Sequence, residues 1–92
     1  RMKYSLSFST QFKHDFKTVQ KRGYNINLLQ RIFNLLESGT ELLINLKAHK
    51  LSGNYADCKE CHIKPDWLLI WRQNEQNSTI ELVRTGTHSD LF

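Results

Sequence analysis

The sequence is poor in the residues on which many small specialised domains depend. It contains two cysteines, one proline and one methionine among 92 residues. Two cysteines, Cys58 and Cys61, cannot build the disulfide framework of a small secreted domain. A chain of this length can bury one modest hydrophobic core without cross-links and has no room for a second core. We therefore expect a single domain over residues 1–92.

Long apolar runs are also missing. The most apolar segment extends only from Trp67 to Trp71, which is far too short to cross a bilayer. The start of the chain, RMKYS, lacks the apolar centre of an export signal, and Arg1 before Met2 is interpreted as a cloning or processing remnant. These absences predict a cytoplasmic protein without a membrane partner.

Basic residues outnumber acidic residues by a moderate margin. Thirteen Lys and Arg against nine Asp and Glu give a formal net charge of +4. An excess of this size suits a polyanion such as RNA or an acidic protein partner, and it also serves solubility alone. The charge therefore leaves both kinds of partner open.

The N-terminal residues predict a strand followed by a helix. Apolar residues alternate with serines from Lys3 to Ser9, which is typical of a half-buried strand. Ser9 or Thr10 can then cap a helix that stops at Gly23, because glycine after a basic last turn is a common stop signal. The apolar side of this helix carries Phe12, Phe16 and Val19, and His14 lies on its polar side.

A second helix is predicted directly afterwards. Asn27 with Gln30 three positions later resembles a capping box, and Gly39 marks the end. Because the joint between the two helices is so short, we expect an antiparallel helix hairpin. The apolar face of the second helix is wide and consists of Leu28, Leu29, Ile32, Phe33, Leu35 and Leu36.

The second half of the chain predicts a loop and then three strands. Residues 41–51 have no clean period and are interpreted as a loop with buried anchors. Pro65 predicts a turn, and the apolar segment that follows it is too short for a helix, so it is interpreted as a central strand buried on both faces. The expected strands are Ala56–Ile63, Trp67–Arg72 and Thr79–Thr85, the last with Ile80, Leu82 and Arg84 on one face.

Together these patterns predict an α+β domain. An N-terminal strand and a helix hairpin precede a three-stranded antiparallel meander, which forms a small sheet with the helices on one face. The polar residues around Pro65 then lie at one end of the central strand, which is a common place for a functional site.

The run Cys58-Lys59-Glu60-Cys61-His62 matches the C-x-x-C-H pattern of covalent haem attachment. Haem proteins of this kind mature outside the cytoplasm, and the chain shows no export signal. In an extended strand the two cysteines also point to opposite faces, and the second ligand pair of a zinc site is missing. We therefore interpret them as free cysteines and expect no cofactor and no metal.

Three of the four histidines lie near other residues that can assist proton transfer. If the segments that carry them converge, they offer a base, an acid and a cation, which is what phosphodiester transfer needs. Trp67 adds a flat surface on which an unpaired base could stack. The residues concerned are His49 with the flanking Lys47 and Lys50, His62 with Asp66, and His88 with Arg84.

Three segments resemble those of a known family. They are HKLSGNY from His49, CHIKPDWLLIWR from Cys61 and LVRTGTHSDLF from Leu82. In this order and spacing, behind a strand and two helices, they resemble the YafQ branch of the RelE/ParE toxin superfamily over essentially the whole chain. The PDW turn and the R-T-G-T-H-x-x-L-F tail are specific to that branch in combination.

The resemblance implies a RelE-like fold and a bacterial, ribosome-dependent mRNA endonuclease that uses no metal. The ribose 2′-hydroxyl attacks the adjacent phosphate of mRNA in the ribosomal A site, and a cognate antitoxin, which we expect to be acidic, holds the toxin inactive. Arg84 is implied to stabilise charge on the phosphate. The implied proton-transfer set is His49, His62, Asp66 and His88. Trp67 and Phe92 are implied to hold the substrate base or to shape the pocket, and we expect Lys47 and Lys50 to bind the substrate as well.

Two questions stay open at this point. The resemblance does not say which histidine is the base and which is the acid. A ParE-like toxin of the same fold would poison DNA gyrase without being an enzyme. The set of three histidines and Asp66 argues against this alternative, because a gyrase binder has no chemical reason to carry it.

Overall fold

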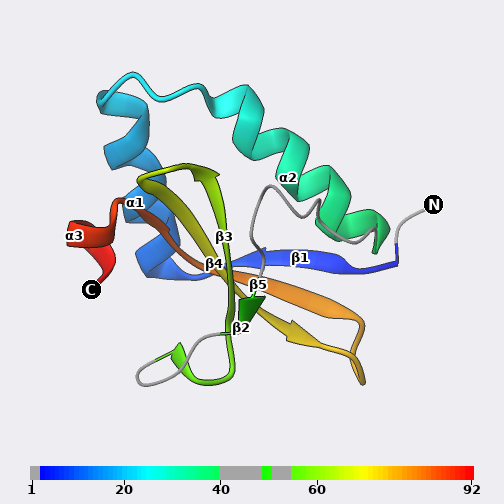
Figure 1. Ribbon diagram of the computed structural model, residues 1–92. Helices are drawn as coiled ribbons and strands as arrows, with labels where there is room; N and C mark the ends of the chain where they lie inside the picture. The colour runs from blue at the N-terminus through cyan, green and yellow to red at the C-terminus, as the bar shows by residue number, and fades with distance from the viewer. Residues whose placement is uncertain (1–2, 40–48, 51–54) are drawn as a thin grey trace.

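The described part of the chain forms a mixed sheet, two long helices and a short C-terminal helix, arranged as Figure 1 shows. The computed structural model describes residues 3–39, 49–50 and 55–92. The predicted α+β class is confirmed. In chain order the elements are β1 (Ser5–Phe8), α1 (Thr10–Lys21), α2 (Ile26–Ser38), β2 (His49–Lys50), β3 (Lys59–Lys64), β4 (Trp67–Asn74), β5 (Thr79–Gly86) and α3 (His88–Leu91).

Within the described residues, the sheet has five strands in the order β1-β5-β4-β3-β2. Strands β3, β4 and β5 form the predicted antiparallel meander. β1 pairs parallel with β5, and β2 pairs antiparallel with β3, so both strands extend the expected sheet at its edges. The sequence patterns predict a loop where β2 lies, because a strand of two residues is too short to show a period.

The helix ends follow from local side-chain hydrogen bonds. The Ser9 hydroxyl accepts from the Phe12 amide at 2.9 Å, which confirms the predicted cap of α1. The cap of α2 is Asn25 and not Asn27, since the Asn25 side chain accepts from the Asn27 amide at 3.1 Å. Gly39 ends α2 as predicted, in the left-handed conformation. Within the described residues, no helix is both long and apolar enough to cross a membrane.

The strand ends differ from the predicted ends where turns compete with the sheet. β3 begins at Lys59 and not at Ala56, because the Cys58 amide closes a turn on the Tyr55 carbonyl at 2.9 Å. The Pro65 turn forms as expected between β3 and β4. The tail after β5 forms α3, which the sequence patterns did not predict because it is only one turn long.

Apolar side chains cover both faces of β4. Leu69 and Trp71 belong to the larger core beneath α1 and α2, whereas Leu68 and Ile70 belong to a smaller core with Leu91 of α3. The prediction of a central strand buried on both faces is therefore confirmed. The two cysteines lie on opposite faces of the sheet as expected, because Cys61 is in the larger core and Cys58 is in the smaller one.

A bulge between β4 and β5 changes the face that Arg84 occupies. Leu82 pairs with Trp71, but Arg84 pairs with Ile70 because the register shifts between Ile70 and Trp71. The prediction that Arg84 shares a face with Ile80 and Leu82 is therefore wrong. Bulges commonly redirect a side chain in this way, and here the arginine turns toward the face that α3 covers.

Candidate active site

Three of the expected residues meet where β3, the Pro65 turn and α3 come together. The Nδ1 atom of His88 lies 2.6 Å from Asp66 Oδ1. The rings of His62 and His88 lie with their centroids 5.6 Å apart and their planes at 40°. His62 pairs across the sheet with Leu68, whose side chain is in the smaller core, so His62 is on the face covered by α3. The structure thus brings His62, Asp66 and His88 into one cluster.

Asp66 fixes the protonation of the His88 ring. The Asp66 Oδ1 atom also accepts from the backbone amide of His88 at 2.9 Å. This amide and the ring together lower the pKa of the Asp66 carboxyl, so it is ionised at neutral pH and acts only as an acceptor. The short contact therefore requires a proton on Nδ1, which leaves Nε2 of His88 to exchange a proton with a substrate.

α3 is held in place by its own cap. Thr87 and Asp90 form a capping box, in which the Thr87 hydroxyl accepts from the Asp90 amide at 3.1 Å and the Asp90 carboxylate accepts from the Thr87 amide at 2.9 Å. Arg22 at the end of α1 donates to the same carboxylate at 2.6 Å and lowers the pKa of Asp90 far below its usual range. Both contacts fix the start of α3, where His88 lies.

Arg84 is held from two sides on the same face of the sheet. Its Nε and Nη2 atoms donate to the two carboxylate oxygens of Asp15 on α1 at 2.7 and 3.1 Å. Its Nη1 atom lies 3.5 Å from the Tyr55 hydroxyl, at the limit of a hydrogen bond. The carboxylate of Asp15 raises the pKa of Arg84, so the guanidinium is permanently charged.

Tyr55 connects Arg84 with the end of α3. Its hydroxyl donates to the Leu91 carbonyl at 3.4 Å, and its ring packs edge-on against Phe92 at 5.6 Å. The Phe92 amide in turn donates to the His88 carbonyl at 2.9 Å, one helical turn back. Arg84 therefore borders the same short helix as His88. Phe92 is 65% exposed beside it, where it can contact a ligand.

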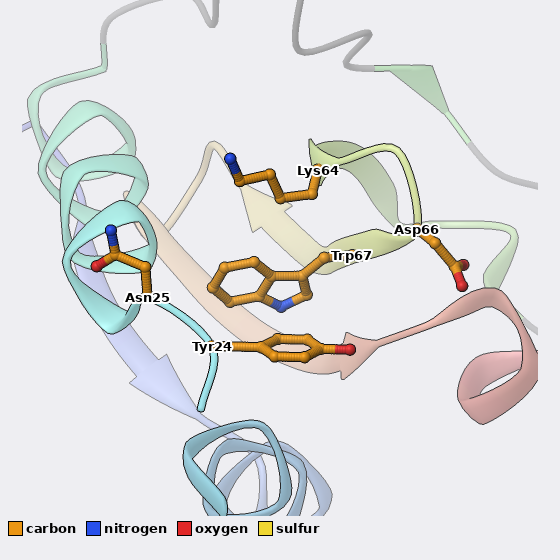
Figure 2. Close-up of a pocket in the computed structure, with 5 residues that line it drawn as sticks. All are labelled: Tyr24, Asn25, Lys64, Asp66 and Trp67. Atoms are coloured by element: carbon orange, nitrogen blue, oxygen red, sulfur yellow. The ribbon is translucent and has the colours of Figure 1, made fainter. Parts of the chain in front are cut away.

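Trp67 lies on the other side of the sheet, in the larger core. It is 3% exposed, its Nε1 atom donates to the Thr85 hydroxyl at 2.9 Å, and Tyr24 packs edge-on against it at 4.9 Å. Figure 2 shows the indole between Tyr24 and Lys64, with Asp66 pointing away from it. The flat stacking surface expected at Trp67 is therefore covered in this structure. Trp67 packs in the larger core, on the side of the sheet opposite the histidine cluster.

A pocket of about 270 Å³ adjoins this indole. Asp66 stands at the border between the pocket and the histidine cluster, because it lines the pocket and also binds His88 (Figure 2). The lining residues are Tyr24, Asn25, Lys64, Asp66 and Trp67.

Of the remaining expected residues, His49 and Lys50 form β2 at one edge of the sheet. Lys47 is outside the described residues, and only the backbone of His49 and Lys50 is described. In the β2–β3 register His49 is opposite Glu60, which is two residues before His62. His14 is exposed on α1, as its place on the polar side of that helix predicts.

Sequence reasoning missed Asp15 and Tyr55, which hold Arg84. Asp15 carried a signal: it is an acid among Phe12, Phe16 and Val19 on the side of the helix that was expected to be apolar. A buried acid in such a place needs a partner. Tyr55 belongs to the family-like segment HKLSGNY, but its place in a turn gave no sign that it contacts Arg84.

The described residues do not fit a metal site. No group of three or more His, Cys, Asp and Glu side chains in residues 3–39 and 55–92 lies close enough to hold an ion. In the histidine cluster, Asp66 is already bound to Nδ1 of His88. The chemistry that the cluster offers is proton transfer beside a fixed positive charge.

Comparisons with known proteins agree with this arrangement. The sequence matches the family described as "Bacterial toxin of type II toxin-antitoxin system, YafQ" over residues 4–92. It is 35% identical over 88 residues to the mRNA interferase toxin YafQ of Escherichia coli strain K12, covering 95% of this chain and 94% of that protein.

Two solved structures are similar over nearly their full lengths. A toxin from Helicobacter pylori, described as metal-bound, has a TM-score of 0.89 and 37% identity over 97% of this chain and 99% of that one. A chain of the E. coli DinJ-YafQ toxin-antitoxin complex has a TM-score of 0.88 and 32% identity over 99% of both chains. The similarity therefore extends through both helices, the sheet and the C-terminal residues.

Proposed function

Because the chain belongs to the YafQ family of type II toxin–antitoxin toxins, we propose that it cleaves mRNA on the ribosome through its histidine cluster. The chain is an mRNA interferase, which is an endoribonuclease. The observation that carries the proposed mechanism is the 2.6 Å contact of Asp66 with His88, beside the ring of His62. The match to a family whose curated relative is an mRNA interferase argues against the gyrase-poisoning alternative.

The proposed reaction is an internal transfer. The ribose 2′-hydroxyl loses a proton to a base and attacks the adjacent phosphorus, and the 5′-oxygen of the next nucleotide leaves with a proton from an acid. The upstream product then ends in a 2′,3′-cyclic phosphate, and the downstream product begins with a 5′-hydroxyl. Such a step needs two groups that exchange protons near neutral pH, and imidazole is the natural choice.

His88 and His62 supply this pair in the proposal. Asp66 holds the Nδ1 proton of His88, so Nε2 is the atom that meets the substrate. The centroid of the His62 ring lies 5.6 Å from that of the His88 ring, so His62 can exchange a proton with the other oxygen. The assignment of base and acid between them stays open. His49 is proposed as a third member of the proton-transfer set, with Lys47 and Lys50 binding the RNA backbone.

Arg84 and Phe92 complete the proposed site. The phosphorane-like transition state carries extra negative charge, and a fixed guanidinium stabilises it more than it stabilises the ground state. Phe92 offers an exposed ring for stacking on a base, and Trp67 supports the Asp66 turn from the opposite face. The ribosome is proposed to hold the mRNA in line for attack, which so small a site cannot do alone.

The proposed partner is an acidic antitoxin. The solved DinJ–YafQ complex shows that the E. coli relative assembles with an antitoxin. The net charge of +4 favours an acidic segment of such a partner over the basic surface, and the segment would cover or distort the site.

Cleavage of a defined mRNA on purified ribosomes tests this proposal. We expect cleavage only with ribosomes, a 2′,3′-cyclic phosphate on the upstream fragment and an unchanged rate in EDTA, measured at a magnesium level that keeps the ribosomes intact. His88→Ala and Arg84→Ala should each lower the rate by about a hundredfold or more, the usual scale for losing a proton-transfer or charge-stabilising group.

His14→Ala is the matched control, because His14 is an exposed histidine on α1 outside the site. Its rate should equal that of the unchanged protein. Equal rates for the His14 and His88 variants, or loss of cleavage on selective chelation of a trace metal, would refute the proposed mechanism.

A further inference from the structure

The buried carboxylate of Asp15 on α1 has contacts besides its ion pair with Arg84. It is 8% exposed. Besides the two bonds from Arg84, it accepts from the Thr85 amide at 3.2 Å and from the Gln11 side chain at 3.2 Å. Buried charges are retained in proteins when their hydrogen bonds are satisfied, and this carboxylate meets that condition. It binds both the side chain of Arg84 and the backbone that follows it.

The way Asp15 binds Arg84 leaves part of the guanidinium available. A guanidinium carries five N–H groups in a fixed fork. Asp15 takes the pair on the Nε side, from Nε and Nη2, and the Tyr55 hydroxyl lies near Nη1. Among the described contacts, one N–H on each Nη atom is then unused. Guanidinium N–H groups are suited to donate to the oxygens of a phosphate.

The helix α1, which carries Asp15, is itself fixed by packing and by an ion pair. Val19, one turn after Asp15, is fully buried, and Arg22, two turns after it, binds Asp90 of the α3 cap at 2.6 Å. Residues at this spacing lie on one side of a helix. The same side of α1 therefore holds Arg84 through Asp15 and holds the start of α3, with His88, through Arg22.

We infer that Asp15 is a positioning residue for RNA cleavage: it orients the Arg84 guanidinium so that its two remaining donors face the scissile phosphate. The inference rests on the proposed function of Arg84. Without Asp15, Arg84 keeps its charge but can adopt other rotamers, and its donors must then be ordered during the reaction. The effect should therefore fall on the chemical step and not on attachment to the ribosome.

A double-mutant cycle tests this inference. The cleavage rate is measured in single turnover on ribosome-bound mRNA, and affinity is measured separately on mRNA with a 2′-deoxy nucleotide at the cleavage position. Asp15→Asn should lower the rate by roughly tenfold or more, with affinity unchanged within about twofold. In the Arg84→Ala background, Asp15→Asn should cause no further loss, because there is no guanidinium left to orient.

The control is Asp57→Asn. Asp57 also pairs with an arginine, Arg72, at 3.0 Å, but this pair is exposed and outside the cluster. Its substitution should leave the rate unchanged. An unchanged rate for Asp15→Asn, or an equal further loss in the Arg84→Ala background, overturns the inference while the proposed function stands. If Arg84→Ala cleaves like the unchanged protein, the proposed role of Arg84 fails and the inference fails with it.

A measurement on the unchanged protein covers the case in which Asp15→Asn does not fold. The Nε–H proton of Arg84 should exchange with water at least tenfold more slowly than that of Arg31, which is exposed on α2. NMR of arginine side chains measures both rates in one sample. Equal exchange would mean that Asp15 does not hold the guanidinium in solution, which overturns the inference without any variant.

Discussion

At the scale of single residues, the candidate site depends on two carboxylates that orient cationic or proton-carrying groups. Asp66 fixes the ring of His88, and Asp15 fixes the guanidinium of Arg84. Asp66 is largely exposed, whereas Asp15 is buried. An exposed carboxylate contributes little to stability on its own. Its significance is the tautomer that it imposes on His88, which is a requirement of the proposed chemistry and not of the fold.

The two cysteines supply a prediction at this scale. Burial raises the pKa of the Cys61 thiol to about 12, and it also raises the pKa of the Cys58 thiol. The thiolate is the reactive form, so neither residue should react with a thiol-specific disulfide reagent at pH 7.5 in the native protein. In denaturant, both thiols should react. Absorbance of the released chromophore counts the thiols in each state.

Lys17→Cys is the positive control, because Lys17 is exposed on α1 and a cysteine there should react at once. A native thiol that reacts as fast as this control would contradict the prediction.

The raised pKa of Cys61 also has a consequence for the stability of the fold. The folded state keeps the Cys61 proton above pH 9.0, its ordinary pKa, where the unfolded chain releases it. This contribution to stability is complete below pH 9.0 and is lost as the pH rises toward 12.

Residue patterns identified the histidine cluster but not the residues that support it. His62, Asp66 and His88 could be selected because their side chains suit proton transfer and their segments resemble a family. Asp15 carried a weaker signal, because an acid on the apolar side of a helix indicates that a partner is needed but not which residue that partner is. The predicted face of Arg84 was wrong for another reason. A bulge depends on how two strands pair, and the alternation of residues along one strand does not encode it.

At the scale of elements, α3 deserves its own test because one helical turn carries His88, Leu91 and the contact with Tyr55. A helix this short has almost no stability of its own. It is held by the Thr87 cap, by Arg22 at its start and by Leu91 in the smaller core. Asp90 stays ionised throughout the range in which a histidine titrates, because its pKa is strongly lowered.

We therefore predict that Thr87→Ala affects activity more than stability. Loss of a helix cap typically costs about 1 kcal/mol. Here it should fray α3 and release His88 from Asp66, so the cleavage rate should fall by roughly tenfold or more. Amide hydrogen exchange should report faster exchange at Leu91 and Phe92, with the global unfolding free energy lowered by no more than about 1 kcal/mol.

Asn74→Ala is the matched variant for this prediction. The Asn74 side chain accepts from the Asn77 amide at 3.0 Å in the β4–β5 turn, at the far end of both strands. Removing this bond should cost a similar amount of stability without changing the rate. If both variants lost activity in proportion to their stability, α3 would have no special role in placing His88.

The elements themselves were predictable to different degrees. Both helices and the β3–β5 meander follow from period, caps and the single proline, and their ends are correct within a few residues. β1 was predicted as a strand, but its parallel pairing with β5 joins opposite ends of the chain, and no local pattern encodes it. β2 and α3 are too short to produce a period.

At the scale of the whole molecule, the cluster of His62, Asp66 and His88 lies on the face of the sheet opposite the larger core, which α2 covers. α1 and α2 cover the larger core on the other face, so their exposed sides are available to a partner or to RNA without moving the cluster. The basic excess acts at this scale, because it attracts any polyanion over distances longer than a contact. Both proposed partners, RNA and an acidic antitoxin, therefore compete for the same molecule.

This competition leads to a prediction about the chain in living bacteria. Induced alone, it should stop growth within a generation or two, because the proposed activity destroys mRNA that the ribosome is reading. His88→Ala should restore growth at the same level of expression, since it removes the proposed proton-transfer group. Growth curves, with immunoblots to match the expression levels, provide the measurement.

The same His88→Ala variant separates catalysis from antitoxin binding. It should bind a cognate acidic antitoxin with nearly the affinity of the unchanged protein, and the association rate of both should fall as salt rises, because screening weakens attraction between opposite charges. Purified antitoxin added to the unchanged toxin should then stop mRNA cleavage on ribosomes at one equivalent of binding sites. Normal growth of cells that express the unchanged chain alone at high level would contradict the toxin function. The proposed activity destroys mRNA, so translation should stop in a cell that lacks the antitoxin.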